Sequence, residues 1–179
     1  MGFWTQRTDP KRKFNFEVSI TGQGSVIQNY YAKTVTKPSF TVNAAEHAYL
    51  NHTFYYPGRV TWNDVSVTFV DPGGGDSASG GLVSMLEGMG YNPPQNPADN
   101  TTISKSKSVT ALGDVNIRQL DEEGNILDEW VLLNAWLTEV NFGDLDYSSD
   151  DLVEITCTVK YDFAKYSEAA SGHSETFKP

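Results

Sequence analysis

The chain has 179 residues, with 23 acidic and 13 basic side chains and a formal net charge of −10. This length corresponds to about one domain, which can bury a hydrophobic core without disulfides or a structural metal. The single cysteine, Cys157, excludes an internal disulfide and a cysteine-rich zinc site. The acidic balance disfavours unspecific binding to nucleic acid, and no apolar run is long enough to cross a membrane. The first residues lack the apolar core of a secretory signal, so we expect synthesis without export.

Charge is distributed unevenly along the sequence. Residues 1–13 form a basic N-terminal arm, whereas residues 114–154 hold twelve acids and a single basic residue, Arg118. The acidic stretch predicts one broad negative surface that repels polyanions and resists unspecific association. We divide the chain into the arm, a β domain over residues 14–165 with an insertion at about 72–110, and a tail over residues 166–179.

The first part of the domain has the patterns of β-strands. Apolar residues alternate over residues 14–20, which predicts a strand with one buried face, and the β-branched and aromatic segment 26–35 predicts a second strand. Residues 38–56 carry aromatic side chains around a polar centre and are interpreted as a long hairpin or an extended loop. Pro57–Gly58 is interpreted as the turn that follows.

One helix is expected in the middle of the chain. The strand predicted over residues 59–70 changes its apolar parity at Asn63–Asp64, which indicates a β-bulge or a sharp bend. After a glycine-rich connection, apolar residues at i, i+3, i+4 and i+7 predict an amphipathic helix over residues 82–89. The polar segment 101–110 is interpreted as an edge strand or an ordered arm.

The second part of the domain is also mainly β. A short strand over residues 115–119 and a turn at 121–125 lead into residues 126–140, which are apolar at both even and odd positions. A strand apolar on both faces needs cover on both, either from its own core and helix or from a neighbouring subunit. Residues 153–161 alternate cleanly and place Cys157 on the apolar face, as a small core side chain rather than a nucleophile. The side chains of three tryptophans in these strands are expected to be largely buried: Trp62, Trp130 and Trp136.

The sequence carries no pattern typical of a catalytic or cofactor site. The three histidines have no nearby set of further metal ligands, and the glycine-rich segment 73–81 lacks the lysine of a phosphate-binding loop. Residues 144–151 are rich in aspartate, as calcium-binding loops are, but lack the glycine and final glutamate of the helix–loop–helix calcium site. We therefore expect no catalytic residue, no cofactor and no metal.

A resemblance to a known family extends along most of the chain. It is carried by Lys13–Val18 behind Asp9–Pro10, by Phe54–Val65, by Gly90–Tyr91, and by a run from Trp130 to Asp162. In order and spacing, these stretches resemble the tail tube protein of contractile-tailed (T4-type) bacteriophages over roughly residues 9–165. The segment Trp-x-Leu-x-Asn-Ala-Trp at 130–136, together with Gly-Asp-Leu-Asp-Tyr at 143–147, is its most specific part.

The resemblance implies a mainly β fold, a small β-barrel or sandwich with one flanking helix, whose sheets join between subunits into a tube. It implies a structural protein, not an enzyme, that forms hexameric rings stacked as the inner tube of a contractile phage tail. Its implied partners are other copies of itself, the surrounding sheath protein, and baseplate and tail-terminator proteins. The resemblance also implies that DNA passes through the channel without specific binding and that the protein does not insert into a membrane. The implied location is the virion, after assembly in the cytoplasm of the host bacterium.

The residues themselves suggest how copies could meet. We expect the acidic stretch 114–154 to contribute to a negative channel wall, because tight contact with DNA would stall its passage. The basic arm could meet the acidic turns at 121–123 or 144–151 of the next ring, or could simply be solvated. The candidate interface residues are Arg7, Lys11, Arg12, Lys13, Trp130, Leu132, Asp121, Glu122, Asp144 and Asp146.

Other interpretations stay open at this point. Within the tube class, the chain could serve a related non-phage contractile injection system or a tube-like cap at the baseplate. Outside it, a stand-alone ligand-binding β domain would stay monomeric at high concentration. A carbohydrate-active enzyme would show a pocket with two converging carboxylates.

Overall fold

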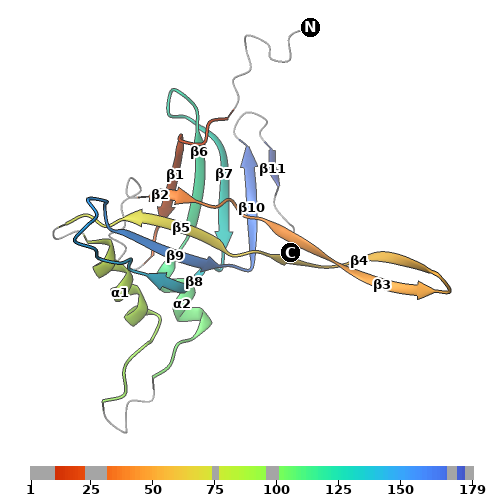
Figure 1. Cartoon of the computed structure of the whole chain (residues 1–179), viewed down its shortest axis with the longest axis horizontal. Helices are drawn as coiled ribbons and strands as arrows, with labels where there is room; N and C mark the ends of the chain where they lie inside the picture. The colour runs from red at the N-terminus through yellow and green to blue at the C-terminus, as the bar shows by residue number, and fades with distance from the viewer. Residues whose placement is uncertain (1–10, 23–31, 74–76, 96–100, 169–172, 176–179) are drawn as a thin grey trace.

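The computed structural model describes residues 11–22, 32–73, 77–95, 101–168 and 173–175. Most of this chain folds into two antiparallel sheets that pack against each other (Figure 1). The sheets have the orders β1-β6-β7-β10-β11 and β2-β5-β9-β8, while β3 and β4 form a separate two-stranded ribbon. The strands are β1 (Phe16–Ile20), β2 (Ala32–Val35), β3 (Phe40–Tyr49), β4 (His52–Trp62), β5 (Val65–Val70), β6 (Val115–Leu120), β7 (Ile126–Leu133), β8 (Trp136–Asn141), β9 (Glu154–Lys160), β10 (Phe163–Glu168) and β11 (His173–Glu175).

The core lies between the two sheets and follows the alternation of the sequence. In β5 and β9, every second residue is buried and the residues between them are half-buried. The two strands pair directly, with Val67 opposite Cys157 and Phe69 opposite Ile155. Val18, Ile117 and Leu132 supply the facing side of the core from the five-stranded sheet. The predicted burial of Cys157 is confirmed, at 1% exposure.

The segment 126–140, interpreted from its sequence as one strand, is in fact two. β7 ends at Leu133 in the five-stranded sheet and β8 begins at Trp136 in the four-stranded sheet. Asn134 makes the corner with a left-handed backbone (φ 53°), and its side-chain amide donates a hydrogen bond of 2.8 Å to Asp162. The parity of the buried residues therefore changes because the chain moves from one sheet to the other.

The described residues contain two helices rather than the single one expected. The predicted helix is α1 (Ala78–Gly88). Ser77 is its N-cap residue, and the carboxylate of Asp71 accepts a hydrogen bond from the backbone N–H of Ala78. The segment interpreted as an edge strand contains α2 (Lys105–Leu112) instead. Its N-cap is Ser104, and the buried residues Ser108, Ala111 and Leu112 have helical spacing. This short, polar sequence carries too few apolar residues to distinguish a helical from a strand period.

The three strand tryptophans are partly buried: most of each side chain is covered, as predicted, but none is fully buried. Trp62 contacts Tyr161 at a ring-centre distance of 5.9 Å, and Trp130 contacts Tyr166 at 4.9 Å. Trp62 and Trp130 pack against the edge of the core and expose the rest of their surface. The strand predicted over residues 59–70 is in fact two strands in different sheets, since β4 ends just before Asn63–Asp64 and β5 begins just after them. The change of apolar parity marks this break.

Candidate assembly surface

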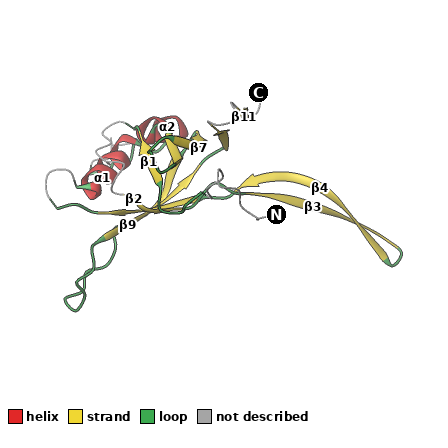
Figure 2. Cartoon of the chain, turned by 90° about the horizontal axis from the view of Figure 1, so that it is seen from above, coloured by secondary structure: helices red, strands yellow, loops and turns green. Residues whose placement is uncertain are grey.

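The most conspicuous surface feature is the hairpin formed by β3 and β4. It projects far from the two-sheet body and has no other element beside its outer half (Figures 1 and 2). Every residue of β3 is exposed, and in β4 only Thr53 and Trp62 are half-buried. A two-stranded ribbon is at best marginally stable in water without cover on one face. This hairpin is therefore a candidate surface for contact with another molecule.

A bulge in the middle of the hairpin divides it into two parts. Val42 pairs with Val60 and Ala44 with Pro57, so Gly58 and Arg59 lie together opposite the single residue Asn43. A side chain at position 58 would approach the Asn43 carbonyl oxygen to 2.8 Å, which requires glycine there. The turn predicted at Pro57–Gly58 is thus wrong. The proline is tolerated inside the ribbon because both of its strands have a free edge.

The bulge places apolar side chains on opposite faces of the ribbon in its two parts. Near the body, the pairs Phe40–Trp62 and Val42–Val60 occupy even positions of β3. Toward the tip, the pairs Ala45–Tyr56, His47–Phe54 and Tyr49–His52 occupy odd positions of β3. Side chains alternate between faces along a strand, so the second set faces the other way. We call the second set the tip aromatic face: Ala45, His47, Tyr49, His52, Phe54 and Tyr56.

The base of the hairpin is fixed to the body. Phe40 contacts Trp62 edge-on at 5.5 Å, and Trp62 in turn contacts Tyr161. The Asn63 amide N–H donates to the Ser39 carbonyl at 2.9 Å, and Lys160 forms an ion pair of 3.4 Å with Asp64. The hairpin is therefore held at its root, while its outer part extends as an uncovered arm.

The sheets also offer free strand edges. β2 and β8 are the two edges of the four-stranded sheet, and neither pairs with a further strand among the described residues. Exposed edges carry unpaired backbone N–H and C=O groups that can pair with another chain. Beside β8 lies an apolar groove of about 260 Å³, lined by residues such as Leu86, Val140 and Phe142.

The outer face of the four-stranded sheet is rich in hydroxyl groups. Ser66 and Thr68 of β5 lie beside Thr158 and Thr156 of β9. Glu154 on this face is bound to Lys33 by an ion pair, and Glu139 pairs across the sheet with Thr158. Together with Lys160, these side chains give the face two acids and two bases.

The basic arm predicted over residues 1–13 lies mostly outside the described residues, Arg7 included. Lys11 is bound to its own chain, since its Nζ lies 2.7 Å from the carboxylate of Asp128, whose side chain is 3% exposed. This contact raises the pKa of Lys11. The Arg12 carbonyl accepts a hydrogen bond of 2.9 Å from Gln119, while the Lys13 side chain is exposed.

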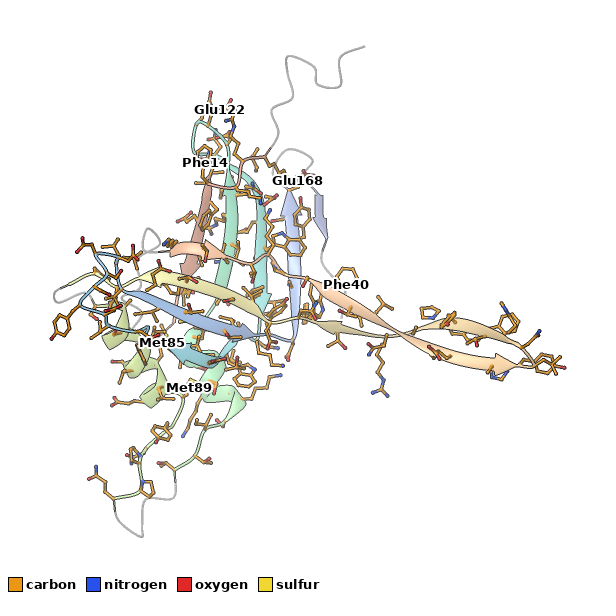
Figure 3. The ribbon with its side chains drawn as sticks, in the orientation of Figure 1. Phe14, Phe40, Met85, Met89, Glu122 and Glu168 are labelled. Atoms are coloured by element: carbon orange, nitrogen blue, oxygen red, sulfur yellow. The ribbon has the colours of Figure 1, made fainter. Side chains whose placement is uncertain are left out.

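The predicted acidic residues sit on two exposed turns far apart in the fold. Asp121 closes the β6–β7 turn by accepting hydrogen bonds from Asn125, which lower its pKa, and the neighbouring Glu122 lies at the outer tip (Figure 3). Asp144 and Asp146 belong to the loop between β8 and β9. The backbone N–H and hydroxyl of Ser148 bind Asp146 at 2.9 and 2.8 Å and lower its pKa.

The two apolar interface candidates occupy different environments. Trp130 is half-buried and keeps part of its surface available. Leu132 is 1% exposed and belongs to the core of its own chain, so the contacts proposed below do not include it. The hairpin itself was not among the residues selected from the sequence. The aromatic residues that flank Leu50–Asn51 in the sequence were the signal that could have identified it, and the structure shows that they are exposed.

The described residues offer little that is suited to a metal site or to a nucleophilic cysteine. No group of three or more His, Cys, Asp or Glu side chains there could hold a metal ion. Burial raises the pKa of the Cys157 thiol to about 12, which leaves it unreactive. None of the helices described is long and apolar enough to cross a membrane.

Comparison with known proteins identifies the fold. The sequence matches no protein-family profile and no curated protein. A chain in the sheath/tube terminator of PVC, an extracellular contractile injection system, is 16% identical with a TM-score of 0.66, over 90% of this chain and 99% of that one. A chain of the PVC sheath-tube complex is 18% identical with a TM-score of 0.62, covering 89% and 93%. A chain of the anti-feeding prophage baseplate is 14% identical with a TM-score of 0.64, covering 90% and 97%.

These neighbours are structural components of contractile assemblies rather than enzymes. The mainly β class expected from the sequence is confirmed, as an open two-sheet arrangement in place of a closed barrel. The resemblance drawn from sequence motifs and the structural likeness therefore agree: the chain has the fold of the tube proteins of contractile tails and contractile injection systems.

Proposed function

We propose that this chain is a structural subunit of the inner tube of a contractile tail, where it forms hexameric rings that stack around a channel. The observation that carries the proposal is the uncovered hairpin on a tube-protein fold. A monomer would leave both the hairpin and two sheet edges exposed, which a stable soluble domain normally avoids.

Ring formation follows from the free edges of the four-stranded sheet. Neighbouring strands of this sheet are antiparallel, so an edge β8 of one copy can pair with β2 of the next and keep the same alternation. Repeating this contact around a closed ring removes every open edge of that sheet. The root of each hairpin lies directly beside β5 and can then reach a neighbouring subunit.

The face of this sheet that points away from the core would line the channel. Its hydroxyl groups hydrate well. Lys33 pairs with Glu154, whereas Lys160 pairs with Asp64, so Glu139 is left without an ion pair among the described residues. On this assignment the channel wall is weakly negative, less so than the acid-rich sequence 114–154 suggests. Without a positive patch, the wall offers DNA no strong binding site.

We assign the chain specifically to a phage tail. Its partners there are the sheath, baseplate and tail-terminator proteins, and DNA passes through the channel of the tube. A tube or tube-terminating subunit of a non-phage injection system fits the same fold, since the neighbours include parts of PVC and of the anti-feeding prophage. Particles isolated with the chain distinguish these cases, because a phage tail joins a DNA-filled capsid and an injection system does not. A terminator would cap preformed tubes without lengthening them.

Light scattering coupled to size-exclusion chromatography tests the basic claim. Over a concentration series of the full chain, we expect a species of six times the monomer mass and, at higher concentration, larger stacks. A monomer at every concentration would count against the tube function.

A further inference from the structure

A basic groove opens at the edge of the sandwich, between β2 and the strands β1 and β6. Its volume is about 620 Å³. Its floor is apolar and formed by Phe16, Val35 and Ile117. Its rim collects five of the thirteen basic side chains of a chain whose net charge is −10. These rim residues are Lys11, Lys13, Lys33, Lys37 and Arg118.

The rim is held in place by carboxylates beneath and beside it. Lys11 and Lys37 both approach the buried Asp128, at 2.7 and 3.7 Å, and Lys37 also donates to Gln119 at 2.6 Å. Lys13 forms no ion pair with any residue that the structure describes, and its side chain is exposed. Arg118 pairs with Glu129 and Glu17, and Lys33 pairs with Glu154. Four of the five rim bases are thus balanced by carboxylates, and Lys13 is the one left to meet an anion beside the apolar floor.

The loop between β8 and β9, residues 142–153, has the complementary character. Three of its apolar side chains are largely exposed, with Leu145 at 87%, Tyr147 at 111% and Leu152 at 70%. Four aspartates lie between or beside them, and none forms an ion pair within the described residues: Asp144, Asp146, Asp150 and Asp151. Figure 2 shows the loop projecting from the body on the side away from the helices.

The loop does not fill the groove of its own chain. Its last residues lead into Glu154, which pairs with Lys33 at the groove rim. Its tip nevertheless points into solvent, as the exposure of Leu145 and Tyr147 shows. An apolar loop tip and an apolar groove floor thus remain separately exposed on each copy.

We propose that the 142–153 loop of one copy docks in the basic groove of the next copy. The aspartates meet the lysine rim while Leu145 or Tyr147 covers the apolar floor. The contact joins the loop surface of one copy to the groove surface of the next copy. Because the two surfaces differ, the contact is heterologous and propagates from copy to copy. It rests on the proposed self-assembly and specifies which surfaces meet. Opposite charges at this contact also select one orientation between chains that otherwise repel.

The β6–β7 turn is the other acidic candidate and fits the groove less well. Asp121 accepts hydrogen bonds within its own turn, as Asp146 does in the 142–153 loop, so the charges alone do not distinguish the two candidates. Residues 121–125 contain no apolar side chain to cover the floor. The turn therefore matches the charge of the groove but not its apolar part.

A charge-exchange experiment on the full chain tests the proposal. Lys13, Asp144 and Asp150 form no side-chain hydrogen bond or ion pair with described residues, so reversing them leaves the fold intact. We expect Lys13→Glu, or Asp144→Lys with Asp150→Lys, each to raise the protein concentration needed for assembly about tenfold at low salt. The three substitutions combined restore opposite charges at the contact and bring that concentration back toward the wild-type value.

Glu122→Lys with Glu123→Lys is the matched control for the double aspartate variant, because it changes the net charge by the same amount on the other acidic turn. We expect this control to assemble like the wild type or more readily. If wild-type protein assembles but the reversals have no effect, or the combination is no better than either part, the docking proposal is overturned and the tube function stands. If wild-type protein never assembles, both are overturned.

Discussion

The tip aromatic face of the hairpin should carry much of the free energy of association between subunits. Phe54 is 46% exposed and Tyr56 is 56% exposed, so about half of each ring remains to be covered by a partner. Full burial of such a side chain contributes about 2–3 kcal/mol, and half of it about 1–1.5 kcal/mol. Replacing both by serine should therefore weaken each hairpin contact by about 2–3 kcal/mol, a factor of roughly 30–150 in the association constant.

The same double variant should barely change the folding of the monomer. The outer hairpin contacts no other element of the described body, and surface substitutions typically change the free energy of unfolding by less than about 0.5 kcal/mol. Sedimentation velocity over a concentration series measures assembly, and urea unfolding monitored by circular dichroism measures stability. Tyr55→Ser, on the opposite face at 65% exposure, is the control.

Two outcomes would contradict this assignment of faces. One is a double variant that assembles at the wild-type concentration. The other is a Tyr55→Ser chain that loses assembly as strongly as the double variant. Either would mean that the bulge does not direct the tip aromatic face toward a partner.

Three further predictions concern the folded monomer. Trp130→Ala should lower the free energy of unfolding by about 2–3 kcal/mol, less than a fully buried tryptophan, because the ring is half-buried against Tyr166; a change below about 1 kcal/mol in urea unfolding would place it outside the core. Asp71 accepts hydrogen bonds from the hydroxyl of Ser79 and from the first N–H groups of α1, and these bonds lower its pKa. The charged carboxylate therefore stabilises the folded chain above the ordinary carboxyl pKa of about 3.9, and this stabilisation is lost as the pH falls through the lower pKa of the folded state. Asp71→Asn should therefore cost about 1 kcal/mol at pH 7 and little at acid pH, and an equal cost at both would exclude a charged cap. Cys157, with a pKa of about 12, should resist thiol reagents at pH 8 until the chain unfolds, and rapid labelling of native protein would refute its burial.

The sequence predicts the core strands well because their alternation is local. The alternation in 153–161 and 115–119 identifies the buried faces of β9 and β6 directly, since each residue's environment follows from its parity. The apolar stripe at 82–89 identifies α1 in the same way, with its first turn before it. These elements needed no information about distant partners.

The errors arise where the fold depends on contacts beyond the local pattern. At Asn134 the chain changes sheet, and only the pairing of β7 with β10 and of β8 with β9 reveals it. At Gly58 a bulge imitates a turn, because the same residue suits both. Serine and lysine in α2 leave its period ambiguous, and tertiary packing of Ala111 and Leu112 decides it.

The candidate contacts were only partly predictable for a related reason. The charges of Lys13, Asp144 and Asp146 were visible in the sequence, but the groove depends on how β1, β2 and β6 meet in space. Lys11 and Leu132 looked available as isolated residues, although the fold uses Lys11 to neutralise Asp128 and Leu132 to fill the core. Sequence identifies which side chains can make contacts, and the fold decides which of them remain free.

Cryo-electron microscopy of the purified full chain at high concentration tests the central claim most directly. We expect stacked six-fold rings around an open channel, with β8 of each subunit paired to β2 of its neighbour and each hairpin covered by another copy. Discrete monomers with a bare hairpin, or an assembly in which β2 and β8 stay unpaired, would contradict the account.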